Sequence, residues 1–442
     1  MRHYVIIGTG VAGFAAAEAI RGQDQSGNIL LVGDEAEGFY SRPGLAYYLT
    51  GEITENQLFP FRKKDFQQLN VQRLHAHAIQ IDTQNNQVKL ESGQHLSYDR
   101  LLIATGARAS QIEVPGNAAH GVVKLDNLQD ARNILNLARK GRSAVVVGGG
   151  ITALEIVEGL VSRGVKTHLF LRSDRYWRNV LDEDESIIVE GLLKEHGVLI
   201  HYNTELAEIF SYRNQVVGAG TTNGRQLKCE LVALAVGVQP RKALAEAAGL
   251  KIHRGLLVDN YLQASDPDIF AAGDVAQVFD PHLGLSAMQS LWGIAREQGR
   301  VAGLNMAGRR QSYHRPIHFN VTRLANLTTT IIGTVGRGID QDLPGIARGD
   351  SESWRYLPDA MSAEVGKNGS HLRLVVDQRT LIGAVVMGDQ TLSAPLQFLI
   401  THQIDISQVR DHLIQPGAPI AALLADFWNQ YLEKHVDPEQ KS

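Results

Sequence analysis

Cysteine is almost absent from this chain of 442 residues, which contains Cys229 alone. A single cysteine excludes an internal disulfide, a redox-active thiol pair and an iron–sulfur cluster held by the chain's own thiolates. Cys229 lies in the apolar run QLKCELVALAVG. This setting predicts a buried strand residue rather than a reactive thiol.

Long apolar runs and an excess of one charge are also absent. No run reaches the roughly 18 apolar residues that a membrane-spanning helix requires. The 43 basic and 47 acidic side chains give a formal net charge of −4, so we expect neither a nucleic acid nor a membrane as partner. With 44% hydrophobic and 20% charged residues, the composition is typical of a soluble globular protein, for which we expect a cytoplasmic location.

The chain opens on a predicted strand that ends in a glycine turn, in the run YVIIGTGVAGFAAAEAIR. Gly8 allows the tight turn, Gly10 lets the backbone approach a pyrophosphate, and Gly13 lets helix and strand pack closely. A second apolar run, NILLVGDE, ends on two acids that can accept hydrogen bonds from ribose hydroxyls. The predicted dinucleotide-binding residues are Gly8, Gly10, Val11, Ala12, Gly13, Asp34 and Glu35.

The same pattern returns in SAVVVGGGITALEIVEGLVSRGVKTHLFLR. Gly148 and Gly150 hold the first two glycine positions, Ile151 begins the helix, and Ala153 takes the third position, which the fingerprint tolerates. Two such units, separated by short alternating runs that are typical of a β-meander, predict two different dinucleotides.

The second unit lacks the acid that would receive an adenosine ribose, and Leu171 and Arg172 stand there instead. Arg175 and Arg178 follow. Arginine can accept a ribose 2′-phosphate, so the sequence favours NADPH over NADH. The alternative is a solvated basic turn that is partly balanced by Asp174.

Three further positions are candidates for binding. Arg42, before Pro43, is expected in an extended loop, where it is either a phosphate clamp or a surface residue. The run DIFAAGDV predicts a strand that ends on Gly273 and Asp274, where an acid can bind a polyhydroxyl chain. A helix is expected around residues 287–307, with its N-terminal dipole available to an anionic ring.

The last ~130 residues change character. Alternating runs predict antiparallel strands, and APLQFLITHQ and IAALLADFWNQYLEKH predict two helices. The segment FWNQYLEK would pack either on its own domain or on a second chain, so a homodimer is possible. No metal site is expected, because His75 and His77 have no further ligand nearby, and Pro316 argues against a helix carrying both His314 and His318.

The motifs GTGVAG, YDRLLIATGA, VVVGGGITALE, LAVGVQP and DIFAAGDVA, in this order, resemble the pyridine nucleotide–disulfide oxidoreductase superfamily. They cover nearly the first 310 residues. The segments YSRPGLAYYLTGE, LWGIAREQGRVAGLNMAG and TLIGAVVMGDQ look most like its NAD(P)H:rubredoxin reductase and nitrite reductase flavin-domain branch, with oxygenase-type ferredoxin reductases as close relatives.

This resemblance implies an α/β fold with two Rossmann-like dinucleotide-binding domains and an α+β C-terminal domain. The FAD-binding domain would span 1–115 and 239–312, the NAD(P)H-binding domain 116–238, and the C-terminal domain 313–442. FAD would occupy the first glycine turn, with Arg42 and Pro43 along its pyrophosphate and Asp274 on its ribitol. Ala104, Thr105, Gly106, Gly237 and Gly273 belong to the matching motifs, and Arg172 and Arg178 match the NADPH-selecting stretch of glutathione reductases.

The resemblance also places Glu155 toward the flavin and the nicotinamide, with a structural helix carboxylate as the alternative. Relatives place a lysine, paired with the equivalent of this glutamate, about where Tyr47 stands. Trp292 would be either a wall beside the flavin ring or a core residue. The redox-active CxxxxC of the disulfide enzymes is absent, and so is the cysteine that the coenzyme A-linked branch carries near residues 40–44.

Without a thiol pair, electrons must leave from the flavin itself. We therefore expect an enzyme that moves a hydride from the nicotinamide C4 to the flavin N5 and then reduces a small redox protein such as rubredoxin or ferredoxin. The alternatives are reduction of a small acceptor, namely oxygen, a quinone or nitrite on a partner subunit, and a flavin-bearing sensor or interaction protein.

Overall fold

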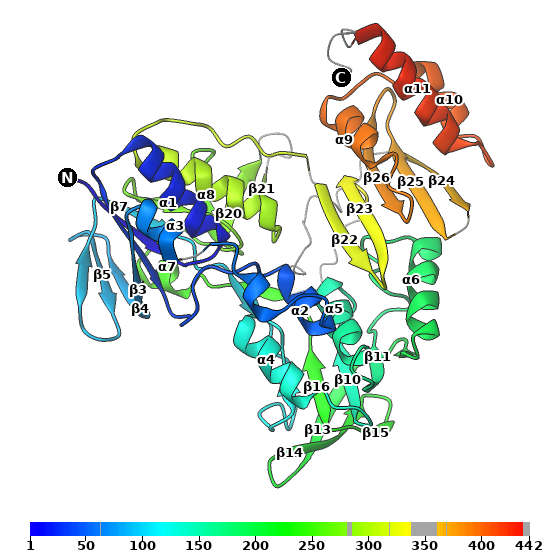
Figure 1. The fold of residues 1–442 in the computed structure, drawn as a ribbon, viewed down its shortest axis with the longest axis horizontal. Coiled ribbons are helices and arrows are strands. Elements are labelled where there is room, and N and C mark those ends of the chain that lie inside the picture. Colours follow the sequence, from blue (N-terminus) through cyan, green and yellow to red (C-terminus); the bar gives the residue numbers. More distant parts are fainter. Residues whose placement is uncertain (62, 281–284, 318, 337–359, 368, 436–442) are drawn as a thin grey trace. The chain divides into compact units, whose positions relative to one another are not determined.

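The computed structural model describes residues 1–61, 63–280, 285–317, 319–336, 360–367 and 369–435. The chain forms two compact units (Figure 1). The first comprises Met1–Arg172 and Gly197–Arg315, and the second comprises Ser173–His196 together with the described residues from Pro316 onward. Within the described ranges, no helix is long and apolar enough to cross a membrane.

A five-stranded parallel sheet begins at the N-terminus of the first unit. Its strand order is β19-β7-β1-β2-β3, and every neighbouring pair is parallel. The central strands are continuous apolar runs, as expected for a sheet that is covered on both faces. The strands are β1 (His3–Ile7), β2 (Asn28–Gly33), β3 (Val71–His75), β7 (Arg100–Ile103) and β19 (Ile269–Ala271).

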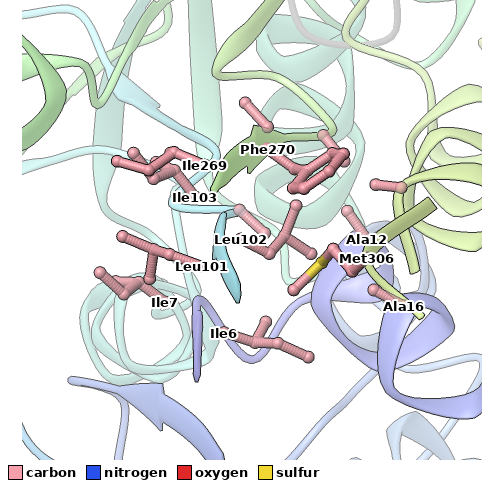
Figure 2. Packing of buried hydrophobic residues seen from close by; sticks show 14 of the residues in the cluster. Ile6, Ile7, Ala12, Ala16, Leu101, Leu102, Ile103, Ile269, Phe270 and Met306 are labelled. Carbon is pink, nitrogen blue, oxygen red and sulfur yellow. The ribbon is translucent and has the colours of Figure 1, made fainter. Parts of the chain in front are cut away.

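Two helices that are far apart in the sequence, α1 (Val11–Gln23) and α8 (Trp292–Met306), pack closely against each other. A Cβ on Gly299 would come within 2.1 Å of the Ala12 carbonyl oxygen, and one on Gly303 within 2.5 Å of the Ala16 carbonyl oxygen. Only glycine allows this approach, which brings α8 onto the sheet beside α1. Figure 2 shows the resulting core, in which side chains of β1, β7 and β19 meet those of α1 and α8.

The helix expected from residue 287 begins five residues later. Ala287 instead pairs with Val278, because β21 (Leu285–Ala287) lies antiparallel to β20 (Ala276–Asp280). Leu291 is still extended, with φ −114° and ψ 134°, and α8 starts at Trp292. The strand expected to end on Asp274 is also shorter, since β19 ends at Ala271.

The second parallel sheet of this unit has the order β12-β11-β10-β16-β9. The helix α5 (Ile151–Val161) follows β10, and α4 (Leu128–Leu137) begins after Asn127, whose side chain accepts a hydrogen bond from the Asp130 N–H. The strands are β9 (Val122–Val123), β10 (Ser143–Val147), β11 (Lys166–Phe170), β12 (Leu199–His201) and β16 (Leu231–Leu234).

Each parallel sheet is accompanied by an antiparallel meander of three strands, and the first of them was predicted from the alternating runs between the two nucleotide units. The meanders are β4 (Ala78–Asp82), β5 (Gln87–Leu90) and β6 (His95–Ser97), and β13 (Leu206–Tyr212), β14 (Gln215–Thr221) and β15 (Gln226–Lys228). Shorter elements of the unit are α2 (Gly44–Thr50), η1 (Glu55–Leu58), α3 (Lys63–Gln68), β8 (Ala107–Ala109), β17 (Val238–Pro240), α7 (Ala243–Ala247) and β18 (Leu256–Val258).

The second unit is built on an antiparallel sheet of order β22-β23-β26-β25-β24. Its strands are β22 (Phe319–Leu324), β23 (Leu327–Gly333), β24 (Met361–Lys367), β25 (Ser370–Val376) and β26 (Leu381–Met387). Its helices are α6 (Glu183–Glu195), α9 (Ser393–Thr401), α10 (Ser407–Leu413) and α11 (Ile420–His435).

The last helix packs on its own unit. This agrees with the first of the two alternatives for the segment FWNQYLEK, packing on its own domain. Leu424 and Phe427 of α11 belong to the buried core that α9, α10 and the sheet share. Trp428 lies with its ring centroid 5.3 Å from that of Phe398 on α9. Two parallel sheets and a C-terminal antiparallel domain confirm the predicted fold class, whereas the domain boundaries at 115, 238 and 312 stay a prediction.

Candidate active site

Four parallel strands of the first sheet bring the predicted flavin-binding residues to one edge. Ile7 pairs with Val32 and with Ile103, and Ile103 pairs with Ala271, so β1, β2, β7 and β19 end side by side. The chain leaves this edge through four segments. They are Gly8–Gly10 after β1, Asp34 and Glu35 after β2, Ala104–Gly106 after β7, and Gly273 and Asp274 after β19. In open α/β sheets, ligands bind outside the carboxyl ends of such strands.

The glycine turn at this edge is shaped by contacts that exclude any side chain. Gly8 has φ +123°, and a Cβ there would lie 2.1 Å from the Ala104 carbonyl oxygen. A Cβ on Gly13 would lie 2.0 Å from the Gly8 carbonyl oxygen. Gly10 differs, because a Cβ there would meet nothing within 4 Å. The turn is therefore tight at its base and open in front of α1.

The N-termini of α1 and α5 are suited to bind phosphate. Gly10 and Gly150 are their N-cap residues, and neither helix has a side-chain hydrogen bond to its cap. The first N–H groups of such a helix have no partner within it, and they favour an anion. The open space at Gly10 and this uncapped helix fit the pyrophosphate of a dinucleotide, with Val11 and Ala12 in the first turn of α1.

The two acids after β2 have different surroundings. Glu35 forms an ion pair with Arg42 and accepts a hydrogen bond from the Tyr40 hydroxyl at 2.8 Å. The Asp34 carboxylate lies 3.5 Å from His77 Nδ1 and 3.8 Å from Arg241, and its side chain is 48% exposed against 22% for Glu35. The structure thus makes Glu35 part of a network and leaves Asp34 more accessible.

Arg42 is held from two sides, immediately before Pro43, which caps α2. Its guanidinium donates hydrogen bonds to the Glu35 carboxylate and to the Asp126 carbonyl oxygen. Arg42 is therefore an anchored residue of this edge and not a free surface arginine.

Sequence reasoning missed three residues that build this network. The Tyr40 hydroxyl accepts a hydrogen bond from the Leu128 N–H at 3.1 Å while it donates to Glu35. Burial raises the pKa of Tyr40 above its usual value, so the hydroxyl keeps its proton. Arg241 lies 3.3 Å from the buried Asp126 carboxylate. The one available signal was the position of Arg241 directly after the motif LAVGVQP.

The second sheet repeats the arrangement at its own carboxyl edge. Val147 pairs with Phe170 and with Leu234, so Gly148, Leu171 and Ala235 begin adjacent turns. Gly148 has φ +145°, and a Cβ there would lie 2.2 Å from the Ala235 carbonyl oxygen, just as Gly8 faces Ala104 in the first sheet. Gly150, Ile151, Gly237 and Arg172 belong to these same turns.

Arg172 is exposed at the end of β11, and no acid replaces it there. Arg178 belongs to the second unit, as do Asp174 and Arg175. There the Asp174 carboxylate lies 3.5 Å from Arg175 and 3.7 Å from Arg178, so the partial charge balance proposed for this turn is present.

Glu155 and Tyr47 lie on two helices that pack together. A Cβ on Gly159 of α5 would come within 2.7 Å of the Leu49 Cβ of α2. Glu155 stands one helical turn before Gly159, on the same side of α5, and is partly buried. Tyr47 of α2 is 39% exposed. The contact between Gly159 and Leu49 joins α5, the helix of the second glycine turn, to α2, which follows Arg42.

Trp292 begins α8 and is partly buried, with its ring centroid 5.7 Å from that of Phe39. Phe39 in turn stacks on Phe14 of α1 at 5.0 Å. Trp292 is therefore part of an aromatic cluster next to α1, and its indole still has an accessible side.

Two buried groups close to the second sheet have pKa values that keep them uncharged at neutral pH. Cys229 is 1% exposed, and burial raises its thiol pKa to about 12, which confirms that it is buried and unreactive. It lies between β15 and β16, whereas the sequence predicts a residue within a strand. His168 Nδ1 lies 2.9 Å from His201 Nε2, and burial lowers the pKa of His168 to about 4. Both imidazoles are thus neutral structural groups at neutral pH.

The chain is also similar in sequence to known proteins. The family model described as pyridine nucleotide-disulphide oxidoreductase matches residues 2–299. The biphenyl dioxygenase system ferredoxin–NAD(+) reductase component of Paraburkholderia xenovorans (strain LB400) is 34% identical over 278 residues, which cover 61% of this chain and 66% of that relative. The rubredoxin–NAD(+) reductase of Pseudomonas putida is 30% identical over 275 residues, 62% of this chain and 71% of that relative.

Among solved structures, the covalent putidaredoxin reductase–putidaredoxin complex contains a chain with the same fold. Its TM-score is 0.83 at 23% identity, and the match covers 96% of this chain and 98% of that chain. The chain spans just under two thirds of the first curated relative's length.

Proposed function

Because the chain belongs to the pyridine nucleotide-disulphide oxidoreductase family, we propose that it oxidises NAD(P)H by means of bound FAD and passes the electrons to a small redox protein. The family membership agrees with the resemblance in the glycine motifs. The first carboxyl edge would hold FAD, and the second would hold the nicotinamide nucleotide. When bound, FAD supplies the capacity to accept a hydride and to release electrons one at a time.

Residues of the first edge have distinct tasks in this proposal. The N-terminus of α1, behind Gly8 and Gly10, binds the pyrophosphate. Asp34 or Glu35 accepts hydrogen bonds from the adenosine ribose, and Asp274 does so from the ribitol. Arg42 orients Glu35 and the start of α2, and Trp292 with Phe39 forms an apolar wall that keeps water from the ring.

The second edge positions the nicotinamide nucleotide. Gly148 and Gly150 let its pyrophosphate reach the N-terminus of α5, and Gly237 leaves room on the neighbouring turn. The exposed Arg172 favours a 2′-phosphate, since no carboxylate stands there to bind a 2′-hydroxyl. Glu155 lies on α5, which packs on the segment that follows Arg42. In this position it orients the nicotinamide.

One observation carries the proposal. The chain has two nucleotide edges, but its thiol is buried and un-ionised and cannot relay electrons. Cys229, the chain's single cysteine, is buried with a pKa of about 12, so no disulfide can relay electrons. The electrons must therefore leave from the cofactor. A one-electron carrier such as a ferredoxin or a rubredoxin suits this exit, and the reductases of P. xenovorans and P. putida carry these partners in their names.

The test is anaerobic reduction of the FAD-loaded protein in a stopped-flow instrument. We expect NADPH to bleach the flavin absorbance within seconds, and NADH to do so more slowly. A rubredoxin or a ferredoxin added afterwards should restore the absorbance. If both nucleotides leave the flavin oxidised, the proposal is wrong.

The same experiment separates the alternatives. Rapid reoxidation by oxygen, a quinone or nitrite with no protein partner would identify a small-molecule reductase. Turnover of only a few cycles per hour with every acceptor would favour a sensor.

A further inference from the structure

The second unit contains an ionisable cluster, whereas the residues of both nucleotide edges belong to the first unit. Strand alternation turns Leu372 and Leu374 of β25 toward the core that they share with α9 and α11, and turns His371 and Arg373 to the other face. On the edge strand β24, Glu364 pairs directly with Arg373 and diagonally with His371. The N-terminus of α6 meets this face, where Glu185 contacts Arg373.

Two buried atoms of the cluster have no hydrogen-bond partner in the part of the chain that the structure describes. Asp182 caps α6 with Oδ1, which accepts the Glu185 N–H at 2.9 Å, whereas its Oδ2 accepts no hydrogen bond and lies 3.1 Å from Arg373 Nε as an ion pair. His371 Nε2 likewise has no hydrogen-bond partner. Both residues are 5% exposed. A buried polar atom without a hydrogen bond is costly, so His371 Nε2 above all indicates a missing ligand.

The geometry brings these atoms together with a third. One ligand atom each from Asp182, Glu364 and His371 lies within 4.8 Å of the other two. The Glu364 side chain is 49% exposed, so its carboxylate can move inward. Glu185 Oε1 lies 3.7 Å from His371 Nε2 and adds a further oxygen at the rim.

The charges of the cluster are not balanced by its own residues. Arg373 is the cation, and its Nε lies 2.9 Å from Glu185 and 3.1 Å from Asp182. Its Nη1 and Nη2 donate to the carbonyl oxygens of Val335 and Val180 at 2.8 Å, and Nη2 also donates to Glu185 Oε2 at 3.0 Å. When all three are ionised, the carboxylates of Asp182, Glu185 and Glu364 exceed this cation by two negative charges.

We propose that Asp182, Glu364 and His371 form a binding site for one divalent transition-metal ion of the Zn²⁺ type. One imidazole nitrogen and two carboxylate oxygens are a donor set that such ions accept. Two positive charges neutralise the excess, and the metal gives His371 Nε2 a partner and Asp182 Oδ2 a second one besides Arg373. The ion would fasten the N-terminus of α6 to the edge strand β24, so its role is structural.

The expectation of no metal site rested on other histidines. The ligands Asp182, Glu364 and His371 are scattered over 190 positions of the chain, and only the fold brings them together. The site does not depend on the proposed redox function.

Metal content of the full-length protein, purified without a histidine tag, tests this inference. After incubation with ZnCl₂ and extensive dialysis, elemental analysis should find one zinc per chain, and calorimetry should show one site. His371→Asn should abolish the site. Glu364→Gln, at a half-exposed position that leaves the fold intact, should weaken it by about tenfold or more. His412→Asn and Glu195→Gln, both at exposed positions of the same unit, should bind as the parent does.

Each contrary result decides against the site. An unmodified chain that retains no zinc would overturn it, and so would zinc that is held equally well by His371→Asn and Glu364→Gln.

Discussion

Gly8 and Ala104 come from strands that are almost a hundred residues apart, yet a Cβ on Gly8 would lie 2.1 Å from the Ala104 carbonyl oxygen. Gly148 has the same relationship to Ala235 in the second sheet, at 2.2 Å. In each case the first glycine of the turn fits against the neighbouring strand's end. The two turns are thus built in the same way, although their third positions differ.

Gly8→Ala should damage the first turn directly. Alanine at φ +123° is strained by about 1–2 kcal/mol, and its Cβ would also overlap a carbonyl oxygen. We expect the variant to lose most of its FAD and to unfold at a lower temperature, as measured by flavin absorbance per chain and by calorimetry. Gly22→Ala is the matched control, because a Cβ on this exposed residue of α1 meets nothing within 4 Å. Full flavin content in Gly8→Ala would contradict this account of the turn.

Arg42→Lys tests whether Arg42 acts through its two-sided contact. Lysine keeps the charge but cannot reach both the Glu35 carboxylate and the Asp126 carbonyl oxygen with a planar group. We expect FAD affinity to fall by roughly tenfold, in line with the loss of one charge-assisted hydrogen bond. The measurement is a fluorescence titration of the apoprotein with FAD. Arg2→Lys, at an exposed residue of the same unit, should bind FAD as the parent does.

Arg172→Glu tests the choice of nucleotide. A carboxylate at the end of β11 would repel a 2′-phosphate and accept a hydrogen bond from a 2′-hydroxyl. We expect kcat/KM for NADPH to fall by at least about tenfold while that for NADH is kept or rises. Lys140→Glu makes the same change of charge near Gly164, at the amino end of the same strand, and should alter neither value. An unchanged ratio in Arg172→Glu would show that Arg172 belongs to a solvated turn.

Cys229→Ala tests the absence of a thiol relay. The thiol is buried and its pKa is about 12, so at pH 8 only about one thiol in ten thousand would be ionised. We expect turnover within about twofold of the parent, and no reaction of the folded parent with a disulfide reagent until denaturant is added. Rapid labelling that abolishes activity would contradict the proposed electron path.

The pair of His168 and His201 should make the protein sensitive to acid. Burial, and then the neighbouring His201 and Lys166, lower the pKa of His168 to about 4 from a usual value of 6.5. Stability is therefore fully present above pH 6.5. As the pH falls from 6.5 toward 4, the unfolded chain takes up a proton that the folded chain refuses, at about 1.4 kcal/mol per pH unit.

His168→Gln should flatten this decline, because it removes the group whose pKa changes on unfolding. Midpoints of urea unfolding measured between pH 7 and pH 4.5 provide the comparison. His120→Gln, at an exposed residue of the same unit, should keep the parent's slope. Equal slopes for parent and His168→Gln would contradict the prediction.

The sequence by itself determined the two nucleotide units, because their chemistry is local. A strand, a glycine turn and a helix follow one another within some twenty residues, and each glycine has a steric reason that can be read without the fold. The absence of a second cysteine was equally decisive, since composition alone excludes a disulfide. Alternating runs in the last third also predicted the antiparallel sheet.

Tertiary structure decided the contacts that join distant segments. Arg42 meets the Asp126 carbonyl oxygen 84 positions away, and Arg241 reaches both Asp34 and Asp126, so no spacing rule could have found them. The start of α8 moved to Trp292 because Ala287 pairs with β20, and a partner strand overrides helical propensity. The cluster of Asp182, Glu364 and His371 depends on strand register and a helix cap together. Neither the strand register nor the position of the helix cap can be deduced from a single sequence, because packing between elements sets both.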